Sequence, residues 1–252
     1  MTDVMHCSNS HPPRNGQPKS YQHSLGQHAL SALQDPSRSD NVEEILAAMK
    51  RAPADTAVQV FGCERLWVLS WEDDTAVEIG RLHGVPILLE AMTRFPENVH
   101  LQLSAAETLQ NLAAVSDTNR DEICSLGGVA LLLQAMMRHL GCTSIQLSGC
   151  TALASLAKEG GNGSAVGNGT PQGFRNYTER RKCIKKAGGY HGIIIAAHHH
   201  PNDLAILKVA YDALIALGRE PAEIKEKLPQ LYSAGQVVSM EGVNNFGQMT
   251  NE

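Results

Sequence analysis

A short apolar segment recurs along the 252-residue chain, and a second apolar segment always begins 16 residues after its start. The clearest copies of the first are VPILLEAM from Val85 and VALLLQAM from Val129, with related copies from Val42 and Tyr190. The second segments begin at Val58, Leu101, Ile145 and Ile206. Because chance similarity would not keep this offset constant, the chain is predicted to consist of internal repeats.

The spacing of the repeats indicates their class. Successive starts lie 43, 44 and 61 residues apart, and the first two values suit the helical repeats of roughly 40–47 residues. The third suits them once a Gly/Asn-rich insertion at 159–176 is set aside, since a long loop adds little closure entropy. The predicted units are 42–84, 85–128, 129–189 and 190–219.

Composition and periodicity together predict an all-α fold. Hydrophobic residues make up 42% of the chain but aromatics only 4%, which suits close helix packing better than a β-sandwich. In the second unit one buried helix face is predicted from residues at helical spacing, namely Leu101, Ala105, Leu109, Leu112 and Ala113.

Besides the two helices of these segments, one shorter helix is expected before each turn. The predicted ranges are Thr75–Leu82, Thr118–Leu126 and Thr178–Ala187, each with one isoleucine at the same position (Ile79, Ile123 and Ile184). The glycine pairs Gly127-Gly128 and Gly188-Gly189 are expected to supply the positive φ where one helix stops and the next begins at a sharp angle.

The run NLAAVSDTNRDEICSLGGVALLLQAM resembles the armadillo repeat, whose third helix ends in an A-L-x-N-L-A phrase before an N-R-x-x-I segment and a G-G turn. The resemblance is strongest between Leu101 and Ala157. It implies an armadillo-type right-handed α-solenoid of about three and a half to four repeats over 41–219, with the third helices lining a concave groove. We expect disorder in 1–40, apart from a short helix at Leu25–Leu33. A short helix at Pro221–Leu231 and a flexible tail are expected in 220–252.

The resemblance also suggests where a partner binds. In the family, an Asn on the third helix grips an extended peptide, often beside a Trp one turn earlier. The Asn position is occupied here by Val68, Asn111, Ser155 and Ala216. The Trp position is occupied by Glu64, Glu107, Thr151 and Asp212. Only Asn111 matches the family pattern, which disfavours a nuclear-import receptor of the importin-α type.

Acidic residues occupy three of the four Trp positions. The predicted partner-binding groove comprises Glu64, Val68, Glu107, Asn111, Thr151, Ser155 and Asp212. Its carboxylates suggest a basic or helical peptide segment as the ligand. The alternative is an ordinary solvated helix face, because exposed charge pairs contribute little.

Three other clusters have alternative interpretations. A possible docking patch for an acidic or phosphate-bearing partner contains Arg180, Arg181, Lys182, Lys185 and Lys186. A Lys/Arg-rich helix is more often simply a solvated face, and this is the interpretation favoured here. Trp67 and Trp71 are predicted to cap the core of the first unit. The run His198–His200 is predicted to be an exposed loop without a metal, because three consecutive histidines cannot all face one ion.

Charge and hydropathy patterns exclude other partner classes. The net charge of −5 and the absence of a long basic run argue against direct nucleic-acid binding. No apolar run approaches the roughly 18 residues of a membrane span. The six cysteines show no C-x-x-C pair, which predicts reduced thiols, with Cys63 and Cys150 on buried faces. A cytoplasmic location is predicted. A mitochondrial presequence is the alternative, because residues 4–34 contain Arg14 and Lys19 but no acid.

No catalytic set of side chains can be placed at one site, so neither enzymatic activity nor a cofactor is expected. We predict a non-enzymatic protein–protein interaction module, acting as a scaffold or structural subunit of a larger assembly such as a cytoskeletal, ciliary or organellar complex. Its protein partners would bind the groove or the ends of the solenoid. The alternative is a peptide-recognising armadillo adaptor.

Overall fold

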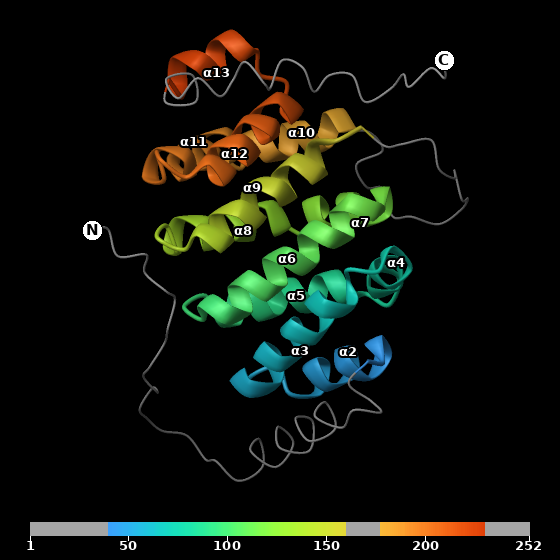
Figure 1. Cartoon of the computed structure of the whole chain (residues 1–252). Helices are drawn as coiled ribbons and strands as arrows, with labels where there is room; N and C mark the ends of the chain where they lie inside the picture. The colour runs from blue at the N-terminus through green and yellow to red at the C-terminus, as the bar shows by residue number, and fades with distance from the viewer. Residues whose placement is uncertain (1–39, 160–176, 230–252) are drawn as a thin grey trace, which may run out of the picture.

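The computed structural model describes residues 40–159 and 177–229, and every regular element in these ranges is a helix (Figure 1). The elements are α2 (Val42–Arg51), α3 (Thr56–Leu69), α4 (Asp73–Arg81), α5 (Gly84–Arg94), α6 (Val99–Val115), α7 (Asp117–Ser125), α8 (Gly128–Arg138), α9 (Thr143–Ala157), α10 (Tyr177–Lys186), α11 (Gly189–His199), α12 (Leu204–Ala216) and α13 (Pro221–Lys227). The predicted all-α class is confirmed. The expected N-terminal disorder, the helix at Leu25–Leu33 and most of the insertion and the tail lie outside the described residues.

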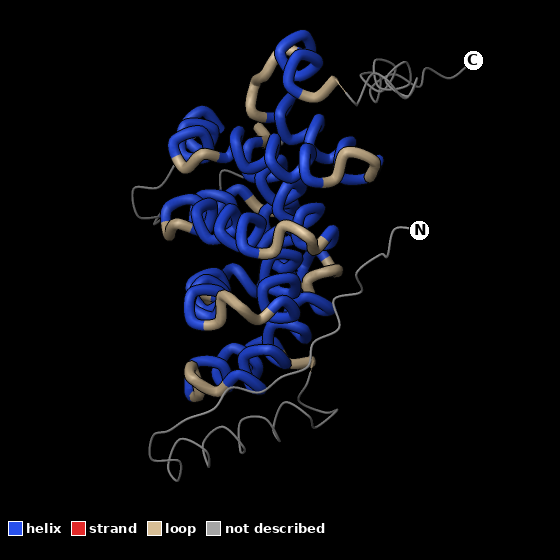
Figure 2. Tube along the Cα trace, turned by 90° about the vertical axis from the view of Figure 1, so that its left-hand side faces the viewer, coloured by secondary structure: helices blue, strands red, loops and turns tan. Residues whose placement is uncertain are grey.

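Helices at equivalent places in the repeats contact one another in three rows. The third helices form the row α3–α6–α9–α12, the short first helices form α4–α7–α10, and the second helices form α2–α5–α8–α11. Figures 1 and 2 show the units stacked from α2 and α3 at one end to α13 at the other. The stacking therefore follows the register of the repeats in the sequence.

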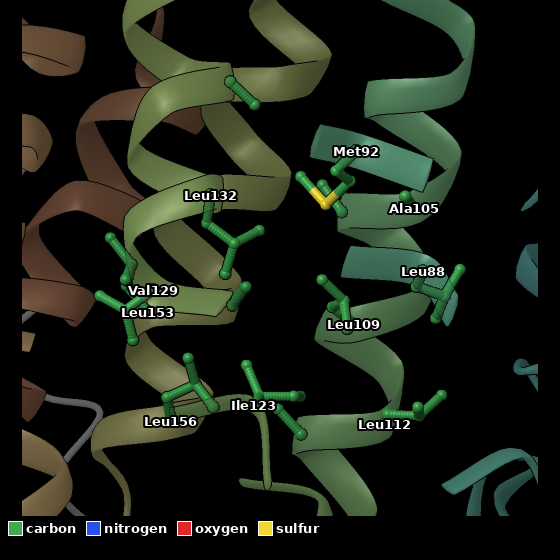
Figure 3. Packing of buried hydrophobic residues seen from close by; sticks show 14 of the residues in the cluster. Leu88, Met92, Ala105, Leu109, Leu112, Ile123, Val129, Leu132, Leu153 and Leu156 are labelled. Carbon is green, nitrogen blue, oxygen red and sulfur yellow. The ribbon is translucent and has the colours of Figure 1, made fainter. Parts of the chain in front are cut away.

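The hydrophobic core lies between these rows, where the third helices pack against the first and second helices. The five residues of the predicted face in α6 are all fully buried, which confirms that prediction. Figure 3 shows Leu109 and Leu112 of α6 facing the same core region as Ile123 of α7 and Leu156 of α9. Small residues such as Ala105 and Ala113 allow the close helix contacts.

Three buried glutamines fix the second helices onto the third helices. Gln59, Gln102 and Gln146 are the second residues of the recurring third-helix segments. Each Nε2 donates two hydrogen bonds, of 2.8 and 3.1 Å, to carbonyl oxygens at the end of the preceding helix. The acceptors are Met49 and Ala52, Met92 and Phe95, and Met136 and His139. These bonds satisfy the methionine carbonyls, which the helix C-terminus leaves unpaired. The other three acceptors also receive a backbone N–H from the following loop. The fourth unit has Leu207 at this place.

An asparagine and an arginine side chain fix the first helix α7 in a similar way. Asn119 Nδ2 donates to the carbonyl oxygen of Leu112 at 3.2 Å, and Arg120 Nη1 donates to that of Ala113 at 2.6 Å, so α7 is held on the end of α6. This geometry gives the N-R-x-x-I segment of the sequence its physical role, because Ile123 then reaches the core.

At the start of α5, α8 and α11, the residue before the helix and the first residue of the helix have different roles in the turn. The first adopts the left-handed conformation, with φ of 81° at Gly127 and 88° at Gly188. His83 takes this place before α5, with φ of 59°. The second residue is a glycine because of close packing. A Cβ on Gly128 would lie 2.7 Å from Ile123 Cγ2, which leaves no room for a side chain.

The histidine run is partly structural, and the prediction of an exposed loop is wrong for His200. His198 and His199 are exposed but belong to the last turn of α11. His200 is half-buried, and its Nε2 lies 2.7 Å from the carbonyl oxygen of Leu140 in the neighbouring unit. The equivalent His139 makes the same contact with Pro96 at 2.9 Å. Sequence reasoning missed this contact because it joins loops from different repeats.

The remaining sequence expectations concern the C-terminal helix, the thiols and membrane spans. α13 is shorter than predicted. Its residue Ile224 and the following Leu228 are both buried. Cys63 and Cys150 are buried as predicted, and burial raises the pKa of each thiol to about 12. The five cysteines in the described ranges are free thiols. Among residues 40–159 and 177–229, no helix combines the length and apolar character needed to cross a membrane.

Replacing Gln102 with alanine tests the role of the glutamine bonds. Gln102→Ala leaves the carbonyl of Met92 without its donor, removes one of the two donors to the carbonyl of Phe95 and opens a cavity, so the free energy of unfolding should fall by about 2–4 kcal/mol. The measurement is equilibrium unfolding in urea. The exposed Gln134→Ala is the matched control and should change stability by about 0.5 kcal/mol or less. Equal losses in the two variants would contradict this role.

Candidate functional site

An open cleft of about 500 Å³ lies between the third helices of the first two units, α3 and α6. Its lining residues come from these two helices and are Phe61, Glu64, Arg65, Trp67, Val68, His100, Leu103, Ser104 and Glu107. Phe61, Glu64 and Val68 recur at helical spacing on α3, as do His100, Ser104 and Glu107 on α6. Two helix stripes therefore face each other across the cleft.

The cleft has apolar walls and a negative charge. Phe61, Trp67, Val68 and Leu103 supply the apolar surface, and Val68, in the last turn of α3, is 46% exposed. Apolar side chains that are exposed together in a cleft are typical of an interaction site. Sequence reasoning missed Phe61 and Leu103, although their helical spacing from the predicted groove residues could have identified them.

Glu64 of α3 and Glu107 of α6 supply the negative charge. Arg65 forms an ion pair with Asp40, which offsets its positive charge. Burial raises the pKa of Glu107 above its ordinary value, and a side-chain hydrogen bond with Ser148 opposes that rise. Glu107 is thus a partly desolvated carboxyl group.

Asn111, the residue that matches the family pattern, lies beyond the cleft and is bound to a neighbour. Its Nδ2 donates to Ser70 Oγ at 2.9 Å, and Ser70 Oγ donates to the carbonyl oxygen of Trp67 at 2.7 Å. Asn111 therefore links α6 to the end of α3. A ligand reaching Asn111 would have to replace or share this bond.

The structure does not gather the other predicted groove residues into the cleft. Thr151 Oγ1 donates to the carbonyl oxygen of Leu147 at 2.8 Å within α9, and Ser155 is buried. Asp212 is exposed on α12. Burial raises its pKa, and the nearby Lys208 and Lys158 lower it. Of the seven predicted residues only Glu64, Val68 and Glu107 share one site.

The prediction that both tryptophans cap the core is wrong. Trp71 follows the end of α3 and is 69% exposed, while Trp67 lines the cleft. Their ring centroids are 6.3 Å apart with an interplanar angle of 65°, so the two indoles meet edge to face. The one-turn spacing suggested a common buried face, but α3 ends at Leu69, before Trp71.

The predicted basic patch separates into a buried and an exposed part. Arg180 is 2% exposed and joins α10 to α7 and α9. It donates to carboxylate oxygens of Asp117 (3.0 Å) and Asp121 (2.8 Å) and to the carbonyl oxygens of Leu156 (3.0 Å) and Lys158 (2.9 Å).

Arg181 Nε donates to the carbonyl oxygen of Ala157 at 3.1 Å, and its guanidinium lies 4.8 Å from the ring centroid of Tyr177. Arg180 and Arg181 thus occupy the places of Asn119 and Arg120 in the previous unit. They hold α10 on the end of α9 across the insertion. A docking patch that uses Arg180 is therefore incorrect, and the exposed members are Lys182, Lys185 and Lys186.

Neither metal ligation nor a known relative defines the site further. In the described part of the chain, no group of three or more His, Cys, Asp or Glu side chains is placed to bind a metal ion. No family model matches the sequence, and no curated protein matches it. The fold is similar to the crystal structure of an engineered protein from the Northeast Structural Genomics Consortium, with a TM-score of 0.55. The two are 21% identical over 90% of this chain and 82% of that one.

Replacing Arg180 tests how the fourth unit is attached. Arg180→Ala removes a buried guanidinium that bonds two partly exposed carboxylates and two carbonyls, so stability should fall by about 2–4 kcal/mol. We expect faster amide hydrogen exchange in α10 to α12, measured by mass spectrometry. The exposed Lys182→Ala on the same helix is the control and should exchange like the wild type. Unchanged exchange in Arg180→Ala would show that the fourth unit is held by other contacts.

Proposed function

We propose that this chain is an armadillo-type right-handed α-solenoid that serves as a non-enzymatic protein-interaction module, a scaffold or structural subunit of a larger cytoplasmic assembly. The three rows of equivalent helices and the resemblance of the repeat in the sequence support the fold type. In a solenoid each unit contacts its neighbours, so partners bind the extended surface formed by the stacked repeats.

The observation that carries the proposal is the cleft between α3 and α6, which combines exposed apolar side chains with two carboxylates. An aromatic and aliphatic centre with charged residues around it is the usual composition of a protein-binding site. Asn111 is bonded to Ser70, and Ser155 is buried. A row of peptide-binding Asn side chains along the third helices therefore does not support this function. The partner surface is instead concentrated in the first two units.

Two valines of equal exposure provide the test. Val68 in the cleft is 46% exposed, and Val77 on α4 outside it is 45% exposed. The full chain, as wild type, Val68→Glu and Val77→Glu, is used for quantitative affinity purification from native lysate. We expect partners to be reduced about tenfold or more with Val68→Glu and retained with Val77→Glu, because a glutamate at the centre of an interface is left desolvated and unpaired.

Circular dichroism of all three proteins checks that the helices are intact. If Val68→Glu retains the wild-type partners in the same ratio, the cleft is not the partner surface. A loss of partners in Val77→Glu alone would move the interaction to the row of first helices.

A further inference from the structure

The two tryptophans of the entire chain lie together at one edge of this cleft. Trp67 lines the cleft, and Trp71 meets it edge to face while leaving most of its own surface in solvent. Exposed indoles cost solvation free energy unless a ligand covers them, and an indole face is the best aromatic surface for a cation. The position of the pair thus adds a cation-binding surface to the apolar cleft.

Two carboxylates reach the same cleft from its opposite walls. Glu64 extends from α3 and Glu107 from α6, while the Arg65 charge is already balanced by Asp40. Burial partly desolvates the carboxyl group of Glu107. Retaining a partly desolvated carboxyl group here is costly for stability, which is typical of a residue that serves binding.

We propose that the cleft binds an arginine side chain of a partner protein, with its guanidinium against Trp67 between Glu64 and Glu107. The aliphatic stem of that arginine lies along Phe61, Val68 and Leu103. This inference rests on the proposed function and names the group that the partner presents.

Arginine fits this site better than lysine for three physical reasons. A guanidinium is planar and stacks on an indole face, whereas an ammonium is a compact point charge. The guanidinium has five N–H donors, enough to serve two carboxylates from opposite walls at once. It is also more weakly hydrated, so it loses less on entering a cleft where Glu107 is already partly desolvated. Citrulline keeps the shape of arginine without its charge and is therefore the informative ligand for comparison.

The experiment uses tryptophan fluorescence, because both indoles of the chain are at the site. The full chain is titrated with the blocked peptide acetyl-Ser-Leu-Arg-Leu-Ser-amide and with matched peptides carrying lysine, citrulline or glutamate in place of arginine. We expect a saturable change for the arginine peptide, about threefold weaker binding of the lysine peptide, and about tenfold or weaker binding of citrulline. The glutamate peptide should not bind.

Variants of the chain test the carboxylates. Glu64→Gln combined with Glu107→Gln should weaken the arginine peptide about tenfold or more, whereas Glu43→Gln combined with Glu78→Gln, which changes exposed acids outside the cleft, should leave it unchanged. Burial raises the pKa of Glu107, so its ionised form destabilises the fold as the pH rises through that pKa. Glu107→Gln should therefore be no less stable than wild type at pH 7.5, and lost binding would not reflect unfolding.

Three outcomes would overturn the inference: no saturable signal with the arginine peptide, equal binding of the citrulline peptide, or full binding by the Glu64→Gln, Glu107→Gln variant. Its failure is distinguishable from failure of the proposed function. If Val68→Glu loses its native partners but the arginine peptide does not bind, the cleft is an interaction surface for a different group. If the arginine peptide binds while Val68→Glu keeps all its native partners, the arginine site is real and the partner surface lies elsewhere.

Discussion

The capture of helix-end carbonyls by side chains of the neighbouring helix is the interaction on which this architecture depends. A fold made of short helices contains many helix ends, and each end leaves carbonyl groups without intrahelical donors. Gln59, Gln102 and Gln146 satisfy those of the second helices. Asn119 and Arg120, and then Arg180 and Arg181, satisfy those of the third helices. Each bond also sets where the next helix lies.

This constraint explains both the regularity of the stack and the location of the cleft. Once the helix ends are fixed, the third helices contact one another in a row. The residues at equivalent positions then determine the chemistry of each junction between neighbouring third helices. Phe61 stands in the first unit at the register of Ser104 and Ser148. At the α6–α9 junction, Ser148 is buried. At the α3–α6 junction, Phe61 and Trp67 instead line an open cleft. The first junction is chemically distinct although the backbone pattern repeats.

The sequence predicted those features that depend on local periodicity. The helical class, the buried face of α6 and the short helices ending near each turn follow from spacing within one repeat, and the structure has them within about two residues. Features that depend on contacts between repeats were missed. The buried role of Arg180 requires Asp117 and Asp121 from the previous unit, and a run of basic residues gives no sign of such partners. His200 and Trp71 were misplaced because a loop contact and a helix end are not visible in periodicity.

The central claim is that a partner occupies the cleft between α3 and α6, and photo-crosslinking tests it most directly. The crosslinking amino acid p-benzoylphenylalanine would replace Leu103 in the cleft or, as a control, Met137, which is 45% exposed on α8. Irradiation in cells followed by mass spectrometry identifies the protein attached at each position. This account predicts a defined partner adduct at position 103, with the attached segment containing an arginine, and no such adduct at 137. A partner attached at 137 but absent at 103 would contradict it.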